Sequence, residues 1–480
     1  MKLYCENDYF KLYQGNMLDM LEVIEPESID SIVTDPPYEL NFMGKGWDNS
    51  GIAFQKETWE KCYTALKSGG YLLAFGGSRT FHRIACAIED AGFEIRDTIM
   101  WLYGSGFPKS MNIANAIEGK VLNGSANKKD FKLLDGEKGV TSIGFAKSNA
   151  EDGFRPNDYN GRETTIKPNI TTDEAKKWIG WGTALKPAYE PVIVARKPFV
   201  GSCVDNVMKN GVGGLNIDEC RVGDSYRYKI KENGFGDNFM DDNWKPSGKE
   251  YEKEVDGRFP ANVILTYDDT DEAEVCAGFP KSKSTGGNGT VNDFSNYGGS
   301  MMNQSNRKEK NKQKDIEKKY AIDEGNASRY FYCAKASRRD RDEGLGEFQN
   351  QYMAFSNQAK AELKRGNTEF KGNPDNPLHY ANSVSVRKNI HPTVKPTDLM
   401  QYLVRLVTPN GGTVLDPFNG SGSTGKAVMF ENQDRDKNYK YIGIEMTEEY
   451  LPIAKARIEF GINFKEEPES VKGQMTIFDI

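Results

Sequence analysis

The feature that most constrains the fold of this chain is a short apolar and β-branched run, 31–34, that ends at two consecutive prolines. Such a run is typical of a buried strand. Because proline has no N–H group and a fixed φ, Pro36 and Pro37 must end the strand in a rigid turn. The turn holds the Asp35 carboxylate close to the ring of Tyr38. In open α/β sheets ligands bind at this end of the strands, so the sequence predicts a ligand site here.

The motif Asp35-Pro36-Pro37-Tyr38 resembles the catalytic motif of amino-group DNA methyltransferases. These enzymes move a methyl group from S-adenosylmethionine to adenine N6 or cytosine N4, whose amine is a poor nucleophile because its lone pair is delocalised. The resemblance implies that the Asp35 carboxylate and the Pro36 carbonyl accept hydrogen bonds from the amine and orient its lone pair. It also implies that Tyr38 stacks on a base flipped out of the duplex. Four residues alone fit an ordinary Pro-Pro turn equally well.

A second motif, Asp416-Pro417-Phe418-Asn419-Gly420-Ser421-Gly422, follows another apolar run far downstream. Glycine lets the backbone approach a ligand closely, and the helix expected at 424–430 offers free N–H groups to a carboxylate. No Gly-Lys-Ser/Thr ends the turn, which excludes a P-loop. The turn resembles the motif with which the same family binds S-adenosylmethionine. The next strand, 441–445, ends in Glu445, which can bind ribose hydroxyls.

A third motif, the hexapeptide 391–396, resembles the family segment that precedes the helix beside the cofactor, expected here at 397–407. The resemblance implies that Thr393 and Lys395 hold the methionine carboxylate. Asn16 stands where the family usually has an acid near the adenine, and it can still donate and accept hydrogen bonds. The predicted cofactor-binding residues are Asn16, Thr393, Lys395, Asp416, Pro417, Phe418, Gly420, Ser421, Gly422, Thr424 and Glu445.

The motif order, catalytic first and cofactor last, matches the β class of amino DNA methyltransferases. The resemblance implies a circularly permuted, Rossmann-like S-adenosylmethionine-dependent methyltransferase fold, of the α/β class, with large target-recognition insertions. Alternating helix and strand patterns independently favour a parallel, doubly wound sheet. The expected strands are 11–15, 71–75, 93–102 and an antiparallel returning strand at 190–195. The expected helices are 17–24, 57–66 with a stop at 68–70, 79–91 and 447–460.

Both ends of the chain are expected to contribute to one discontinuous domain. We predict a catalytic half at 1–105, an insertion with possible DNA contacts at 106–177, the returning strand at 178–198, a variable target-recognition region at 199–388, a cofactor-binding half at 389–465 and a tail at 466–480. Strand candidates within the variable region are 214–222, 261–266 and 328–335.

Two groups of residues are candidates for DNA contacts. Lys45 and Trp47 lie in a Gly-containing stretch, 39–51, which suits a mobile loop over the base pocket, although an ordinary surface loop fits equally well. Lys335, Arg338 and Arg339 follow three aromatic residues, and interleaved aromatic and basic residues suit phosphate contacts. The alternative for this second group is a solvated segment.

Composition restricts the class of protein without identifying it. The chain has 480 residues and a net charge of −7, so it has no overall nucleic-acid signature. Seven cysteines without a Cys-x-x-Cys pair predict reduced thiols and no metal site, in the cytoplasm of a bacterium or a phage-infected cell. The sequence shows no secretory signal or membrane-spanning run. The expected partner is double-stranded DNA; a homodimer and a partner restriction nuclease remain open.

Three functions fit this pattern. Adenine-N6 methylation comes first because an acid opens the catalytic motif, whereas cytosine-N4 enzymes more often have serine there. Cytosine-N4 methylation is second. A catalytically silent DNA-binding protein with the same fold is third, and the intact Asp35, Asp416 and Glu445 disfavour it. The motif order disfavours a protein or RNA methyltransferase.

Overall fold

The computed structural model describes residues 1–40, 48, 50–103, 110–124, 170–223, 226–232, 249–255, 257–267, 281–284, 288–289, 318–319, 323–326, 331–335, 338–349, 351–354 and 384–463. The chain divides into two compact units. Unit 1 comprises Met1–Gly104, Tyr189–Gln349 and Lys388–Ile480, and unit 2 comprises Ser105–Ala188 and Asn350–Arg387.

Unit 1 is built on a ten-stranded sheet with the strand order β1-β2-β18-β17-β3-β4-β6-β5-β9-β14. Its five strands from β2 to β4 in this order are mutually parallel, whereas β6 is antiparallel to both β4 and β5, as expected for the returning strand. The strands are β1 (Lys2–Glu6), β2 (Phe10–Gln14), β3 (Ile29–Thr34), β4 (Leu66–Phe75), β5 (Glu94–Tyr103), β6 (Tyr189–Arg196), β9 (Val263–Tyr267), β14 (Tyr332–Lys335), β17 (Thr413–Asp416) and β18 (Lys440–Glu445).

The two ends of the chain meet in the middle of this sheet, where β3 pairs with β17. Every residue of β3 is buried, as in a parallel strand that is covered on both faces. Its polar side chains have partners from the C-terminal block: Asp30 accepts a hydrogen bond from the Thr413 amide at 2.7 Å, and Thr34 donates to Asp416 at 2.6 Å. The N-terminal and C-terminal blocks therefore form one sheet.

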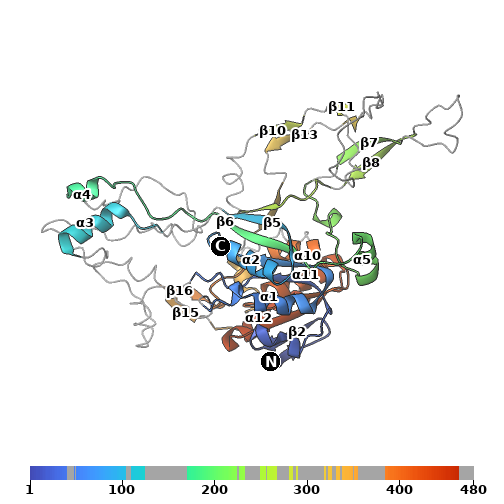
Figure 1. Ribbon diagram of the computed structural model, residues 1–480, viewed down its shortest axis with the longest axis horizontal. Coiled ribbons are helices and arrows are strands. Elements are labelled where there is room, and N and C mark those ends of the chain that lie inside the picture. The colour runs from blue at the N-terminus through green and yellow to red at the C-terminus, as the bar shows by residue number, and fades with distance from the viewer. Residues whose placement is uncertain are drawn as a thin grey trace, which may run out of the picture. The chain divides into compact units, whose positions relative to one another are not determined.

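Helices cover both faces of the sheet (Figure 1). On one face, Val33 and Leu73 share a core cluster with residues of α10 (Thr397–Val407), α11 (Ser423–Arg435) and α12 (Leu451–Asn463). On the other face, the neighbouring residues Ile32 and Leu72 share a second cluster with residues of the 3-10 helix η1 (Met17–Glu22), α1 (Lys56–Ala65) and α2 (Phe81–Asp90). Successive strand residues point to opposite faces, so this division confirms the doubly wound α/β architecture.

Some sequence-based boundaries were wrong. The strand expected at 214–222 is absent: this segment holds a 3-10 turn, η6 (Asp218–Cys220), and its Val222 forms an isolated bridge with Arg258. The helix stop expected at 68–70 lies inside β4, because α1 already ends at Ala65. The helix expected at 17–24 is the 3-10 helix η1, which ends at Glu22, and the helix expected at 447–460 begins with a 3-10 turn, η9 (Glu448–Tyr450), before α12. Strand β1 was not expected at all.

The remaining elements are short. Unit 1 also contains η4 (Ile52–Phe54), α5 (Cys203–Asn210), α7 (Arg338–Asp342) and the strand pairs β7 (Tyr226–Glu232) with β8 (Lys249–Val255), β10 (Lys281–Ser284) with β13 (Asp323–Asn326) and β11 (Asn288–Gly289) with β12 (Lys318–Lys319). Unit 2 contains α3 (Ile113–Asn123), α4 (Asp173–Lys176) and the pair β15 (Gln351–Ala354) with β16 (Val384–Arg387). Within the described part of the chain, we find no helix of the length and apolarity that crossing a membrane requires.

Candidate active site

The Asp35 carboxylate lies directly after β3 and faces a buried lysine. Lys395 Nζ lies 2.6 Å from Asp35 Oδ2 and 3.4 Å from Glu190 Oε2. Burial alone would lower the pKa of Lys395, but the Asp35 and Glu190 carboxylates outweigh it and hold this pKa above its ordinary value. Lys395 is therefore charged. The second oxygen, Asp35 Oδ1, is buried and accepts no hydrogen bond from the described residues.

Glu190, the second residue of β6, organises the aromatic side of the site. It accepts hydrogen bonds from the Tyr38 hydroxyl at 2.8 Å and from the Tyr103 hydroxyl at 3.3 Å. Burial, with the nearby Asp35 and Glu190 charges, raises the pKa of Tyr38 well above its ordinary value, so this phenol stays neutral. The Tyr38 carbonyl in turn accepts a hydrogen bond from Thr80 at 2.8 Å. Glu190 was not among the predicted site residues, and its only signal in the sequence is that of a single acid before Pro191 in an apolar strand.

Asp416, at the end of β17, ties the catalytic strand to the Gly-rich turn. Its two carboxylate oxygens accept hydrogen bonds of 2.6 Å each, one from Thr34 and one from Thr424, and the Phe418 amide donates a third at 3.1 Å. Asp416 is only 2% exposed, and burial raises its pKa to about 6 although these hydrogen bonds favour the charged form. Strongly shifted carboxyl groups are concentrated at functional sites.

The turn itself brings Gly420 and Glu445 together. The Gly420 amide donates to Glu445 Oε2 and the Thr447 amide donates to Glu445 Oε1, each at 2.7 Å. Burial raises the pKa of Glu445 to about 7. Gly420 and Gly422 have φ values of +51° and +76°, which favour glycine. A Cβ at Gly422 would lie 3.0 Å from the backbone of Ala454, so the turn packs closely against α12.

His391 supports this turn and is not placed for proton transfer. A Cβ on Gly420 would lie 2.9 Å from His391 Nε2, so the ring packs directly against the glycine. The other ring nitrogen contacts the Thr393 carbonyl, and the Tyr450 ring lies 4.6 Å away between centroids. Burial lowers the pKa of His391 to about 4, so the ring is neutral at pH 7. These contacts give His391 a structural role in the turn.

The other candidate residues are distributed around this centre. Asn16 accepts a hydrogen bond from the Leu18 amide at 3.1 Å and caps η1. The half-buried Phe418 ring lies 6.4 Å from the Trp59 ring. Pro36, Pro417 and Ser421 are buried, and Pro37 and Thr393 are half-buried. The structure thus brings three pairs together: Asp35 with Lys395, Asp416 with Thr424, and Gly420 with Glu445.

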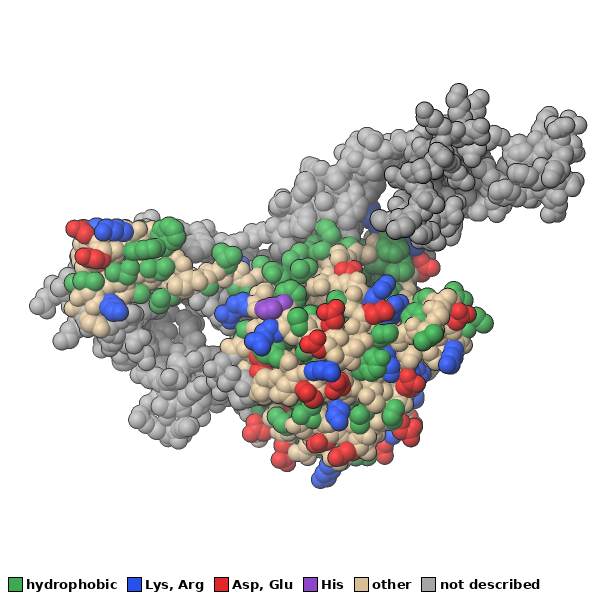
Figure 2. All heavy atoms as spheres, in the orientation of Figure 1, with side chains coloured by type: hydrophobic (Ala, Val, Ile, Leu, Met, Phe, Trp, Pro, Cys, Tyr) green, Lys and Arg blue, Asp and Glu red, His purple; other side chains and the backbone are tan. Residues whose placement is uncertain are grey.

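The side chains of the DNA-contact candidates lie outside the described part of the structure. Lys45 and Trp47 lie outside the described residues. Lys335 ends β14, and Arg338 and Arg339 begin α7, but only their backbone lies in the described part of the chain. Figure 2 shows acidic and basic side chains interspersed on the visible face of the described residues. These candidates therefore remain predictions.

Comparisons with known proteins extend over most of the chain. The sequence model of a family described as DNA methylase, of the N6/N4 type, matches residues 29–456, from the first residue of β3 into α12. The type II methyltransferase M2.LlaDCHI of Lactococcus lactis subsp. cremoris is 25% identical over 243 residues, which are 44% of this chain and 84% of that protein. The DNA adenine methyltransferase YhdJ of Escherichia coli strain K12 is 33% identical over 87 residues, 18% of this chain and 28% of that protein. Among solved structures, the PvuII DNA methyltransferase (cytosine-N4-specific) aligns with a TM-score of 0.37 and 13% identity, covering 98% of this chain and 93% of that chain.

Proposed function

Because this chain belongs to the N6/N4 DNA methylase family, we propose that it transfers a methyl group from S-adenosylmethionine to an exocyclic amine in double-stranded DNA, with adenine N6 as the target. The observation that carries the proposal is the buried Asp35 Oδ1, an acceptor without a hydrogen bond from the described residues, beside the half-buried ring of Tyr38. A buried acceptor without a partner is costly. The amine of a flipped base would satisfy it.

The chain's own residues then account for the chemistry. S-adenosylmethionine supplies an electrophilic methyl group when bound. Asp35 Oδ1 accepts a hydrogen bond from the target amine, orients its lone pair and stabilises the positive charge that develops on the nitrogen. Lys395 holds the other oxygen, Oδ2, and so fixes the plane of the carboxylate. The neutral Tyr38 offers a face for stacking, and its hydroxyl is held by Glu190.

Two observations support the fit of the proposed cofactor-binding residues to S-adenosylmethionine. Glu445 is an acid held at a strand end by two amides, which is suited to accept ribose hydroxyls. The glycines at 420 and 422 keep the turn free of side chains, so its backbone can approach the methionine part. Thr393, Lys395, Phe418 and Asn16 complete the proposed set. Lys395 contacts Asp35, and its ammonium group has three donors, so it would contact the methionine carboxylate while it stays paired with Asp35.

Adenine is proposed over cytosine because the motif begins with aspartate at position 35. One of the relatives is named as an adenine methyltransferase, which supports the same choice. The variable region, 199–388, and the insertion at 106–177 would provide sequence recognition, since reading a site requires base-edge contacts in addition to phosphate contacts. We also propose that the protein acts in the cytoplasm of a bacterium or a phage-infected cell, where its described cysteines, all free, stay reduced.

Mapping of modified bases tests this function directly. The protein and its Asp35→Ala variant are expressed in a host that lacks its own DNA methylation, and genomic DNA is analysed by long-read sequencing and by mass spectrometry of nucleosides. We expect N6-methyladenine in one sequence context with the native chain and none with the variant. N4-methylcytosine would establish the second candidate, and unmodified DNA together with DNA binding would establish a catalytically silent binding protein.

A further inference from the structure

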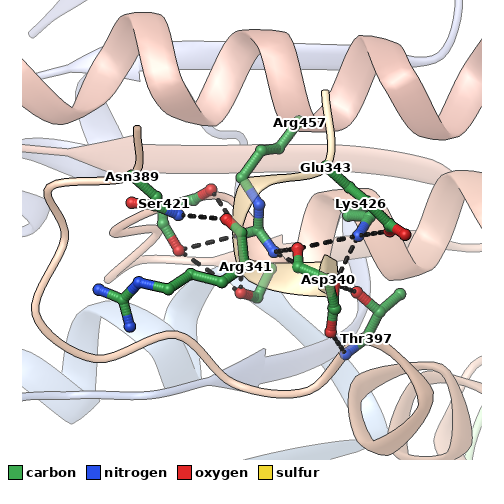
Figure 3. Close-up of polar contacts among 9 residues, drawn as sticks. Asp340, Arg341, Glu343, Asn389, Thr397, Ser421, Lys426 and Arg457 are labelled. Atoms are coloured by element: carbon green, nitrogen blue, oxygen red, sulfur yellow. Dashed lines mark hydrogen bonds and ion pairs between the residues drawn. The ribbon is translucent and has the colours of Figure 1, made fainter. Parts of the chain in front are cut away.

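A buried ion-pair network joins the last part of the variable region to the cofactor-binding half (Figure 3). Its centre is Asp340 of α7, which is 9% exposed. Lys426 Nζ of α11 lies 2.5 Å from Asp340 Oδ1. At the start of α10, the Thr397 amide donates to Asp340 Oδ2 at 2.7 Å, and the Thr397 hydroxyl donates to Oδ1 at 2.5 Å. One carboxylate thus contacts two helices of the cofactor half.

The same carboxylate neutralises an arginine that holds the cofactor turn. Arg457 of α12 is fully buried, and its Nη2 lies 3.5 Å from Asp340 Oδ1. Its second terminal nitrogen, Nη1, donates to the Ser421 carbonyl, the Ser421 hydroxyl and the Ser423 hydroxyl, each at 3.0 Å. Among the described residues, Asp340 is the acid that forms an ion pair with Arg457. A charge that loses its buried partner is strongly unfavourable.

A second set of contacts joins α7 to Gly420, the residue of the turn that precedes Ser421. Arg341 donates to the His391 carbonyl, and Asn389 donates to the Arg341 carbonyl at 2.9 Å. The ring of His391 packs against Gly420. The two sets of contacts reach adjacent residues, Gly420 and Ser421, so α7 is linked to the turn twice.

We propose that Asp340 is a positioning residue for the cofactor turn, and that it acts through Arg457 on the backbone carbonyl of Ser421. The inference rests on the proposed function, because it takes the Gly-rich turn to be the S-adenosylmethionine site. Although burial opposes its charge, Lys426 and Arg457 hold the pKa of Asp340 below its ordinary value, so the carboxylate is ionised at pH 7. The turn is therefore positioned by a residue that lies outside every motif that carries the family resemblance.

The test compares Asp340→Asn with a matched control, Glu431→Gln. Asparagine keeps the shape of the side chain and an acceptor for Thr397 but removes the charge that Arg457 needs. Glu431 is also fully buried and pairs with an arginine, Arg405, at 2.5 Å, but it lies near the far end of α11 from the turn. Both variants should lower the melting temperature. We expect Asp340→Asn alone to weaken S-adenosylmethionine binding, by about tenfold, the size typical of one lost hydrogen bond to a charged group.

Binding is measured by calorimetry on the full-length protein, with the melting temperature as a separate readout. If the wild-type chain does not bind S-adenosylmethionine, the proposed function fails. If the wild type binds and folded Asp340→Asn binds equally well, or if Glu431→Gln weakens binding as much, the positioning role is wrong.

Arg457→Lys keeps the test decisive if Asp340→Asn does not fold. Lysine retains a positive charge for Asp340 but cannot span from the carboxylate to the Ser421 carbonyl as a guanidinium does. We expect this variant to fold and to bind the cofactor about tenfold more weakly, for the same reason. Wild-type affinity in Arg457→Lys would overturn the inference.

Discussion

Lys395 and Asp35 are 360 positions apart in the sequence, yet Lys395 Nζ lies 2.6 Å from Asp35 Oδ2. The pair joins the C-terminal block to the end of the catalytic strand. Because the ammonium contacts one oxygen only, it balances the charge of the carboxylate and leaves Oδ1 as an acceptor. Glu190 contacts the same ammonium at 3.4 Å, so three segments of the chain meet at this lysine.

Replacing Asp35 with alanine is expected to remove nearly all methyl transfer and to leave cofactor binding largely intact. The carboxylate acts on the target amine in the transition state, and the loss of such a group typically lowers the rate by about a hundredfold or more. Single-turnover transfer and calorimetric S-adenosylmethionine binding are the two measurements. Asp90→Ala, which removes an exposed acid of α2, is the control. Transfer at the wild-type rate in Asp35→Ala would remove Asp35 from the mechanism.

Gly420→Ala is expected to weaken cofactor binding, whereas Gly411→Ala is not. Both glycines have positive φ, +51° and +74°, so both substitutions strain the backbone, at a cost of about 1 kcal/mol. At Gly420 the new Cβ would also lie 2.9 Å from His391 Nε2, while at Gly411 nothing lies within 4 Å. Equal cofactor affinities in the two variants would show that the close contact with His391 does not matter for the turn.

Glu445→Gln should make the stability of the free protein less dependent on pH and should weaken cofactor binding. Burial raises the pKa of Glu445 from 4.5 to about 7. The stability that comes from its proton is fully present below pH 4.5 and is lost as the pH rises through 7. Glutamine avoids the buried charge but leaves one of the two amides that Glu445 accepts without its acceptor. The stability of the variant relative to the wild type should therefore increase by about 3 kcal/mol between pH 4 and pH 8.

Urea unfolding at both pH values measures this difference, and calorimetry measures cofactor affinity. In the wild type, affinity should increase between pH 6 and pH 8, because the carboxylate is the form that accepts ribose hydroxyls. A stability difference that does not depend on pH would contradict the raised pKa.

The double variant Arg338→Ala/Arg339→Ala should bind all DNA more weakly and with a smaller salt dependence. Phosphate contacts carry no sequence information, and each lost contact lowers the slope of log K against log salt by about 0.9. Binding to cognate and non-cognate duplexes is measured over a salt series. A loss confined to the cognate duplex would mean that these arginines read bases, and an unchanged slope would mean that they form a solvated surface.

The ends of three strands could be predicted from the sequence because each apolar run stops at a recognisable turn. Thr34, Asp416 and Glu445 all lie where they were expected. Glu190 carries only a weak signal, a lone acid in an apolar strand, and Asp340 carries none, because it lies in a run of mixed charges, 338–343. Their partners, Tyr38 and Arg457, are distant in sequence, so the contacts exist only once the sheet and its helices are assembled.

The wrong assignments have identifiable causes. Gly69 and Gly70 suggested a helix stop, but the Gly69 amide and the Gly70 carbonyl bond to Lys197, which continues the pairing of β4 beyond Arg196. A Cβ at Gly69 would lie 2.0 Å from Asn206 Nδ2, so the glycine makes room for α5 rather than for a turn. In 214–222, where a strand was expected, the Asn216 amide bonds instead to the Leu406 carbonyl at the end of α10.

The central pairing of β3 with β17 also has a consequence for biosynthesis. Thr34 and Asp416 are 382 positions apart, and at ribosomal rates of about 5–20 residues per second the second strand is made roughly 20–80 s after the first. Until then one edge of β3 has no neighbour, and an open strand edge is a template for pairing with other chains. The yield of folded protein in a cell should therefore depend on chaperones that protect the nascent N-terminal half during this interval.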